Sequence, residues 1–494
     1  MLSRLGNLAR MVVLAAIYST VGAVIVLVAV FVVYMNGRPD LNVWHLADLD
    51  EEFRADAGIN TFTDYLALEE RLFKQLDELV YAKIPSDQQT EINRYNRGSL
   101  SDSARWKPDW NRSFELTAKS PKAGVLLLHG MSDSPYSLRQ LGERLNAAGA
   151  QVLGLRMPGH GTAPSGLVEL TWQDMAAATR LAMSHLAAQI GDRPIYIVGY
   201  STGAALAVHY ALAALEDSTL PRAERLVLLS PAIGVSSVAA LAVWQGRLGH
   251  LLGLEKLAWN LILPEYDPFK YGSFAVNAGD VVYQLTNEIQ ERITALDQAG
   301  KLKSLPQILA FSSVVDATVS TTALVSGLFE RLPANGHELV LFDINRVTEM
   351  EPLMKWDPDQ VIQTLQQGSG QAFVLSVVTN ETEQSRRVVM ASKRPGSDFL
   401  SVSRLGQSWP DDIYSLAHVA LPFPPNDPLY GGDLAGKSPG IRLGNIALRG
   451  ERGALQVAAS EMLRLRWNPF YAFVEARVLE FIGLDEPQES GKML

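Results

Sequence analysis

The sequence predicts an α/β fold with a mostly parallel sheet and helices on both of its faces. From Val125 onward, short apolar runs alternate with segments of helical periodicity, a pattern typical of strand–helix–strand units. Runs such as VLLLH and RLVLLS are apolar throughout, as expected for parallel strands covered on both faces. At 494 residues the chain exceeds the usual size of one core, so we expect additions to this sheet.

The expected strands are short, and helices fill the intervals between them. The predicted strands are Val125–Leu128, Gln151–Leu155, Ile195–Val198, Leu226–Leu229, Gln307–Val314 and Glu338–Phe342. The predicted helices are Ser137–Ala147, Thr171–Gln189, Thr202–Ala214 and Ala317–Leu332, with a closing helical region near Leu455–Ile482. Together these elements predict one domain over residues 121–483.

Composition excludes several classes of function. The 43 Lys and Arg against 53 Asp and Glu give a net charge of −10, which repels a phosphate backbone, so nucleic acid is not an expected partner. The chain has 0 Cys, which rules out disulfides, thiol nucleophiles and thiolate metal sites. Its histidines are scattered, so we expect no metal and no other cofactor. Any nucleophile is therefore an oxygen or a nitrogen.

The amino-terminal segment has the length of a membrane span. No charged residue occurs in Met11–Gly37, and about 20 such residues suffice to cross a bilayer, so residues 11–35 are predicted to form a transmembrane signal-anchor helix. A cleaved signal peptide and a buried core helix are the alternatives, but Val33–Asn36 offers no A-x-A-like cleavage site. Arg4 and Arg10 precede the span and acidic residues follow it. The positive-inside rule then places the N-terminus in the cytoplasm and the domain over residues 121–483 outside it, in the periplasm for a Gram-negative bacterium.

Residues 36–120 are expected to form a membrane-proximal stalk or N-terminal extension. An amphipathic helix is predicted there after Asp64, because apolar residues recur at helical spacing: Tyr65, Leu68, Leu72, Leu76 and Leu79. We expect this helix to pack on the main domain. Ser113–Ala118 is predicted as a strand that leads into that domain.

Two long stretches interrupt the alternation of strands and helices. Residues 232–304 are apolar and aromatic and far exceed a usual connection, which predicts a helical cap over a pocket. An ordinary pair of packing helices is the alternative. Residues 345–410 form an insertion with two apolar runs, Ala372–Thr379 and Arg386–Ser392, which are predicted to pair as a hairpin.

The candidate nucleophile is Ser201, in the sequence Gly199-Tyr-Ser-Thr-Gly203. This G-x-S-x-G motif lies between a predicted strand and a predicted helix, the context that the motif requires. The two glycines allow a sharp turn in which a Cβ would collide with neighbouring backbone. The turn would hold Ser201 at the carboxyl end of the sheet, where α/β sheets bind their ligands.

Acyl transfer also needs amide donors for an oxyanion. We expect these to be the backbone amides of Thr202, which follows the nucleophile, and of Met131, in the loop after the strand Val125–Leu128. His129 precedes the nucleophile and is expected to brace this loop.

Chain order selects the candidate base and acid, which follow the serine as Asp or Glu and then His. His418 is the histidine that comes after the last main strand in a loop, and we take it as the base. Asp316 ends the strand Gln307–Val314 and is the candidate acid, although a helix-capping role would also place an Asp there. Asp343, at the end of the following strand, is the rival acid.

With these motifs in order, the chain resembles the α/β-hydrolases of the monoacylglycerol lipase and carboxylesterase type, which include serine aminopeptidase-like members. The resemblance rests on five segments: LLLHGMSDSP at Leu126–Pro135, RMPGHG at Arg156–Gly161, GYSTG at Gly199–Gly203, VVDATV at Val314–Val319 and SLAHV at Ser415–Val419. It implies an α/β-hydrolase fold with a helical cap after the sixth strand, and hydrolysis of carboxylic esters, often acylglycerols. Soluble members of the family lack the anchor, and their histidine usually follows the last strand closely.

We therefore expect a membrane-anchored serine hydrolase that acts on a small-molecule or lipid ester through an acyl-enzyme. His418 would take the proton of Ser201, and Asp316 would hold the imidazole in the required tautomer. Two alternatives stay open. One is an acyltransferase, thioesterase or aminopeptidase on the same triad, and the other is a non-catalytic envelope scaffold.

Overall fold

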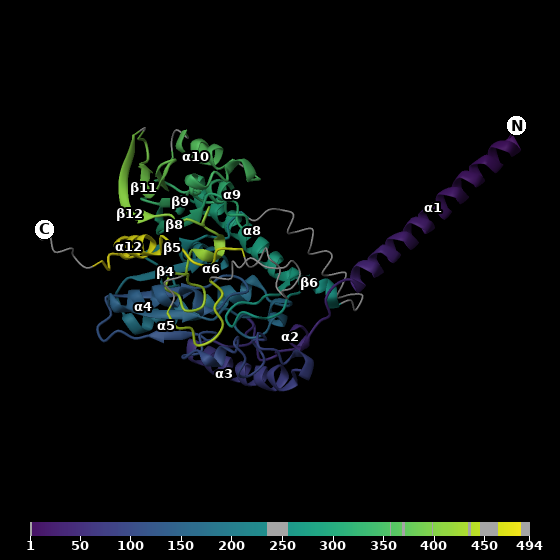
Figure 1. Cartoon of the computed structure of the whole chain (residues 1–494), viewed down its shortest axis with the longest axis horizontal. Helices are drawn as coiled ribbons and strands as arrows, with labels where there is room; N and C mark the ends of the chain where they lie inside the picture. Colours follow the sequence, from purple (N-terminus) through teal and green to yellow (C-terminus); the bar gives the residue numbers. More distant parts are fainter. Residues whose placement is uncertain are drawn as a thin grey trace, which may run out of the picture.

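A central sheet organises the molecule (Figure 1). A computed structural model describes residues 2–234, 255–355, 357–367, 371–397, 399–432, 436–444 and 463–485. Within these residues the main sheet has ten strands in the order β1-β3-β2-β4-β5-β8-β9-β10-β11-β12. The strands from β3 to β10 in this order are parallel, whereas β1, β11 and β12 run antiparallel to their neighbours. The mostly parallel sheet predicted from the sequence is present.

Each of the six predicted strands is found within a residue or two of its predicted bounds. They are β2 (Ala123–Leu128), β3 (Ala150–Leu155), β4 (Ile195–Tyr200), β5 (Arg225–Leu229), β8 (Gln307–Ser313) and β9 (Glu338–Phe342). The strand expected at Ser113–Ala118 is the short β1 (Phe114–Leu116), which pairs with β3 at the sheet edge.

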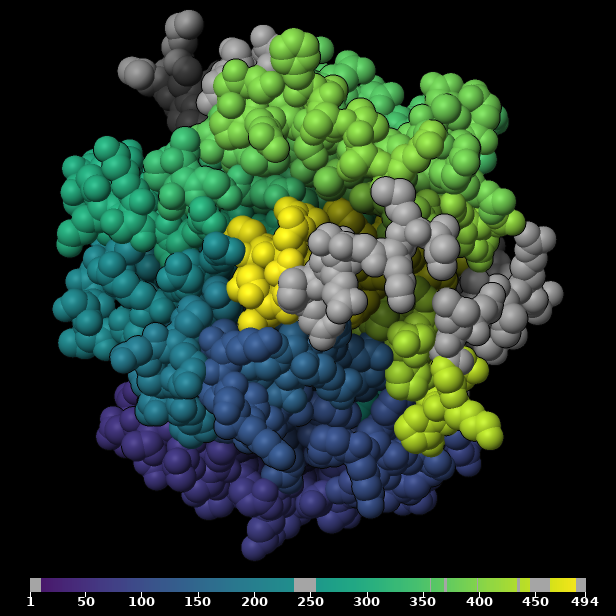
Figure 2. Space-filling view, turned by 90° about the vertical axis from the view of Figure 1, so that its left-hand side faces the viewer, coloured from purple at the N-terminus to yellow at the C-terminus, as the bar shows by residue number. Residues whose placement is uncertain are grey.

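Helices cover both faces of the sheet. They are α4 (Arg139–Ala147), α5 (Trp172–Ile190), α6 (Thr202–Glu216), α8 (Val276–Gln298), α9 (Thr321–Gly327) and α12 (Tyr471–Ile482). Residues of α5, α6 and α8 share one core with one face of the sheet, and residues of α4 and α12 share a second core with the other. Figure 2 shows the yellow C-terminal residues between the blue segment around α4 and the green segment of β10–β12. The alternation of side chains along β2 explains this arrangement, since Leu126 and Leu128 join the first core and Val125 and Leu127 the second.

One predicted helix is shorter than expected. The sequence predicted a helix over Ala317–Leu332, but α9 begins at Thr321, and a separate 3-10 turn follows at Phe329–Arg331. The residues before Thr321 instead form a turn, in which the amides of Thr318 and Val319 donate to Asp316. The side chain of Ser320 caps α9 by accepting from the amide of Ala323.

The insertion extends the main sheet. The predicted hairpin is formed by β10 (Val374–Thr382) and β11 (Ser385–Lys393), and a third strand, β12 (Leu400–Ser408), pairs with β11. β10 joins the main sheet by parallel pairing with β9. The sequence pattern missed β12 because most of its side chains are exposed and polar, so it lacks an apolar run.

The stretch expected to form a cap is described only in part, because residues 235–254 lie outside the described residues. Within the rest, β6 (Trp259–Leu261) and β7 (Phe274–Ala275) form a separate two-stranded sheet. The long helix α8 follows and packs in the same core as α6. The cap itself stays a prediction.

The N-terminal helix α1 (Leu2–Asn36) projects away from the rest of the chain in Figure 1. An 18-residue window within Arg10–Asn36 has a mean hydropathy of 2.6 and is 0% buried, so this segment is long and apolar enough to cross a membrane. The predicted amphipathic helix is α3 (Phe62–Leu79), capped by Thr61, and its apolar face is buried. Phe62, Tyr65 and Leu68 pack into the core that lies between the sheet and α5.

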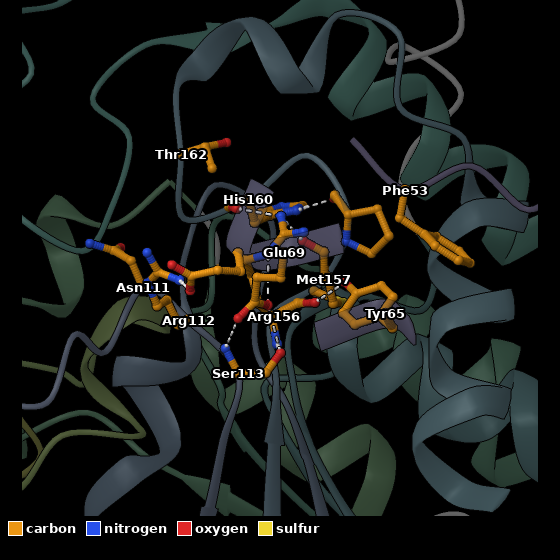
Figure 3. Close-up of polar contacts among 12 residues, drawn as sticks. Phe53, Tyr65, Glu69, Asn111, Arg112, Ser113, Arg156, Met157, His160 and Thr162 are labelled. Atoms are coloured by element: carbon orange, nitrogen blue, oxygen red, sulfur yellow. Dashed lines mark hydrogen bonds and ion pairs between the residues drawn. The ribbon is translucent and has the colours of Figure 1, made fainter. Parts of the chain in front are cut away.

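A buried charge cluster around Arg156 attaches this N-terminal region to the sheet (Figure 3). Arg156 follows β3 and its side chain is 0% exposed. Its guanidinium donates to both oxygens of Glu52 at 3.0 and 3.1 Å and to Glu69 at 3.0 Å. Glu69 also accepts from the amide and the hydroxyl of Ser113 at 3.0 and 2.9 Å. Because Glu52 and Glu69 come from the N-terminal region, breaking this cluster would loosen that region from the sheet.

The neighbouring residues Glu69 and Glu70 of α3 provide a matched test of this cluster. Glu69→Gln leaves the buried Arg156 short of one countercharge, so we expect a loss of about 3 kcal/mol in the free energy of unfolding. Glu70 pairs with Arg112 at the surface, where its side chain is 77% exposed, so Glu70→Gln should cost less than about 1 kcal/mol. Urea unfolding of the full-length protein in detergent, followed by Trp fluorescence, measures both values. Equal losses in the two variants would contradict this account.

Candidate active site

Ser201 lies in a sharp turn between β4 and α6. Its backbone has φ 53° and ψ −116°, a conformation that a residue with a side chain rarely adopts. A Cβ on Gly203 would stand 2.1 Å from the carbonyl oxygen of Leu128, and one on Gly199 would stand 2.5 Å from the backbone of Ala204. Both positions therefore require glycine, as the motif predicted.

Three side chains from distant parts of the chain form a hydrogen-bonded series. Nε2 of His418 lies 3.0 Å from the hydroxyl oxygen of Ser201, and Nδ1 of His418 lies 2.7 Å from a carboxylate oxygen of Asp316. All three residues are buried. Because an ionised carboxylate only accepts, Nδ1 donates to Asp316 and Nε2 is left to accept from the serine hydroxyl. We refer to these residues as the candidate triad.

The environment of Asp316 favours its ionised form. Burial by itself raises the pKa of Asp316, but His418 and the amides of Val319 and Thr318 outweigh burial and hold the pKa below its usual value of 3.8. The amides donate to one carboxylate oxygen, whereas His418 donates to the other. Asp316 can therefore accept from the turn amides with one oxygen and orient His418 with the other.

The rival acid Asp343 is engaged elsewhere. Its two oxygens accept from the guanidinium of Arg346 at 2.8 and 2.9 Å and from the hydroxyl of Thr379 at 2.7 Å. Asp343 also accepts from the amide of Ile344 at 2.8 Å, so in the described chain its side-chain hydrogen bonds go to these three residues, and the series of the candidate triad ends at Asp316.

The two ends of the long insertion after β9 lie close together. The amide of Asn345, just after β9, donates to the carbonyl of Tyr414 at 2.8 Å, and the side-chain amide of Asn345 donates to the carbonyl of Ile413 at 2.9 Å. These bonds place Ile413 and Tyr414 beside the end of β9. The loop that carries His418 therefore starts close to the sheet, even though β10–β12 intervene in the sequence.

The loop after β2 lies against the nucleophile turn. A Cβ on Gly130 would stand 3.2 Å from Cβ of Ser201, so the loop approaches Ser201 closely. Among the described residues, the backbone amides of Met131 and Thr202 donate to no acceptor, so both are available to a ligand.

Other histidines of the described chain contact neighbouring backbone groups or rings. His129 contacts the carbonyl of Gly130 and accepts from the amide of Met157, so it braces the loop after β2. His160 contacts the carbonyl of Pro158, and His337 accepts from the amide of Ile308 at the opposite edge of the sheet. His209 lies on α6 beside Trp172, and His250 is outside the described residues. Burial lowers the pKa of His160 and of His337 to about 4, which keeps both neutral near pH 7.

Within the described ranges, no group of three His, Asp or Glu side chains is arranged to hold a metal ion. A cavity of about 220 Å³ beside the candidate triad is lined by several charged residues. Ser132 and Val419, the sequence neighbours of Met131 and His418, line it together with Lys270, Arg464 and Arg466. These three cations lie in loops without a motif, so no sequence pattern predicted them as site residues.

A family model described as serine aminopeptidase, S33 (Hydrolase_4) matches residues 119–343. A curated relative, the thermostable monoacylglycerol lipase of Bacillus sp. (strain H-257), is 28% identical over 135 residues. That match covers 27% of this chain and 51% of the lipase, so the chain spans about half the length of the curated relative that it matches.

Two solved structures illustrate the similarity. The Paleococcus ferrophilus monoacylglycerol lipase is 20% identical, with a TM-score of 0.36, and the match covers 47% of this chain and 89% of that one. The carboxyl esterase of Bacillus coagulans is 16% identical, with a TM-score of 0.36, and the match covers 51% of this chain and 92% of that one. The family model matched over residues 119–343, the parallel sheet and the serine in its strand–turn–helix together indicate an α/β-hydrolase fold in this part of the chain.

Proposed function

We propose that this protein is a serine hydrolase that cleaves carboxylic esters through an acyl-enzyme intermediate. The observation that carries the proposal is the hydrogen-bonded series from Ser201 through His418 to Asp316. A hydroxyl beside an imidazole that a carboxylate orients is the arrangement by which a serine is activated for attack on a carbonyl. The similarity to a monoacylglycerol lipase favours esters as substrates.

The reaction proceeds in two halves. Nε2 of His418 accepts the proton of Ser201 as the serine oxygen attacks the ester carbonyl, and Asp316 stabilises the imidazolium that forms. His418 then gives this proton to the departing alcohol, which leaves an acyl group on Ser201. In the second half a water molecule, deprotonated by His418, attacks the acyl-enzyme, and the carboxylic acid is released.

The backbone amides of Met131 and Thr202 are the proposed donors to the oxyanion. In the described part of the chain neither amide has another acceptor, so neither must break a bond to serve. Each such donor contributes about 2.7–4 kcal/mol to lowering the activation barrier in comparable sites.

We further propose that α1 anchors the protein in a membrane with the N-terminus in the cytoplasm and the hydrolase domain outside it. The apolar segment Arg10–Asn36 and the charges that flank it support this topology. Where α1 ends, Arg38 donates to the carbonyls of Lys256 and Trp259 at 2.9 and 2.6 Å. Leu261 and Leu263, a few residues further, line the cavity beside the candidate triad. An anchored α1 would thus hold the cavity near the membrane surface, which favours lipid-derived esters.

Replacement of the nucleophile tests the proposed chemistry. Ser201→Ala should lower kcat for p-nitrophenyl esters by on the order of 10⁶-fold, because no acyl-enzyme can form. Ser165→Ala is the control, since it removes a buried serine hydroxyl that has no hydrogen-bond partner in the described part of the chain. Initial rates on p-nitrophenyl esters, thioesters and aminoacyl amides measure both variants and separate ester hydrolysis from thioesterase and aminopeptidase activity. Unchanged ester hydrolysis in Ser201→Ala would overturn the proposal.

Replacement of the acid gives a second prediction. Asp316→Asn should lower kcat about 10⁴-fold, because the imidazole loses its orienting carboxylate, whereas Asp343→Asn should change kcat less than about 10-fold. The folded-state pKa of Asp316 lies below 3.8, so its ionised form stabilises the fold above pH 3.8, and this contribution is lost as the pH falls through the folded-state pKa. The free energies of unfolding of wild type and Asp316→Asn should therefore converge below pH 3.8. A larger loss of kcat in Asp343→Asn would make Asp343 the acid.

Removal of the N-terminal helix tests the anchor. A protein that begins after Gly37 should be recovered in the soluble fraction and should keep its kcat for short water-soluble esters, because no residue before Gly37 belongs to the candidate triad. The full-length protein should stay with membranes after alkaline carbonate extraction. A soluble full-length product whose N-terminus maps downstream of residue 37 would instead identify the segment as a cleaved signal peptide.

A further inference from the structure

The cavity beside the candidate triad carries a surplus of positive charge. Among its lining residues in the described ranges, three cations, Lys270, Arg464 and Arg466, stand against one carboxylate, Asp267. Neutral donors already occupy that carboxylate. The hydroxyl of Tyr430 lies 2.7 and 2.8 Å from its two oxygens, and the amides of Phe269 and Lys270 donate at 2.9 and 3.1 Å. Asp267 also forms an ion pair with Arg466 at 3.9 Å, so its charge is directed to Arg466 and not to Lys270 or Arg464.

In the described part of the chain, the ammonium of Lys270 has an ion-pair partner but no hydrogen-bond acceptor. Its ammonium makes no hydrogen bond to the residues that the structure describes, and its nearest carboxylate, Asp133, is 3.8 Å away. The side chain of Asp133 is only 2% exposed, whereas that of Lys270 is 25% exposed. Burial lowers the pKa of Lys270 and raises that of Asp133 to about 6, and each charge only partly offsets the effect of burial on the other. An anion in the cavity would supply the acceptor that Lys270 lacks.

The other cations lie close to the reacting groups. Arg464 donates to the hydroxyl of Thr318 at 3.0 Å, and the amide of Thr318 donates in turn to Asp316. Ser132 and Val419, on the wall of the same cavity, adjoin the proposed oxyanion donor Met131 and the base His418 in sequence. A group bound between Lys270 and Arg464 would therefore belong to a molecule that reaches Ser201.

We infer that this cavity binds an anionic group of the substrate. On the proposed ester hydrolysis, the substrate class is then an acyl ester whose alcohol portion carries a phosphate or a carboxylate. The cavity volume of about 220 Å³ equals roughly seven water molecules, which is room for a small charged headgroup. The apolar wall that Leu261 and Leu263 provide suits the adjoining part of the acyl ester.

A pair of esters that differ only in charge tests the inference in the full-length protein. Wild type should hydrolyse a 1-acylglycerol 3-phosphate with a higher kcat/KM than the 1-acylglycerol of the same chain length. Lys270→Met should lower the ratio of the two kcat/KM values about 10-fold or more, and Lys270→Arg should restore most of it. Lys303→Met, which removes an exposed positive charge elsewhere, should leave the ratio unchanged. A ratio that changes less than about 2-fold in Lys270→Met would overturn the inference.

Binding without turnover separates this inference from the proposed function. Calorimetric titration with glycerol 3-phosphate, with glycerate and with neutral glycerol should show tighter binding of an anion, weakened by Lys270→Met. The tighter of the two anions identifies the preferred group. Anion binding that depends on Lys270, without any ester hydrolysis, would support the site and refute the proposed function. Ester hydrolysis without such binding would refute the site and leave the proposed function standing.

Discussion

The backbone of Ser201 is the constraint on which the arrangement of the site depends. A residue with a side chain at φ 53° and ψ −116° carries strain of about 1–3 kcal/mol, which the surrounding structure must offset. Here β4 and α6 hold the turn from both sides, and the absence of side chains at Gly199 and Gly203 lets α6 begin directly against the ends of β2 and β4. The turn places Ser201 at the edge of the sheet where the loops that follow β2, β8 and β9 also begin.

Two attachments keep this edge intact despite large additions to the chain. Asn345 bonds to both Ile413 and Tyr414, so β10–β12 extend the sheet sideways without displacing the loop of His418. On the other side, the buried Arg156 holds Glu52 and Glu69 of the N-terminal region beside the end of β3. With the additions attached in this way, the hydrogen-bonded series from Ser201 through His418 to Asp316 still forms.

Local patterns in the sequence predicted most of the central sheet and the three residues that the structure brings together. Continuous apolar runs identify buried parallel strands, and the G-x-S-x-G turn is defined within five residues. Interactions between distant residues were not predictable in the same way. The pairing of β10 with β9 depends on which edge strand of the sheet is free. The hydrogen bond from Asn345 to Ile413 joins residues that are 68 positions apart. Lys270 and Arg464 meet in one cavity only because two unrelated loops converge there, and neither loop carries a recognisable motif.

The assignment of the nucleophile is tested by treating the full-length protein with a fluorophosphonate. Intact mass and peptide mapping then identify the residue that is modified. The proposed mechanism predicts one adduct, on the peptide that contains Ser201, with labelling slowed strongly in His418→Ala because the serine loses its base. Modification of a different residue, or no modification of a folded protein that still hydrolyses esters, would contradict the assignment of Ser201 as the nucleophile.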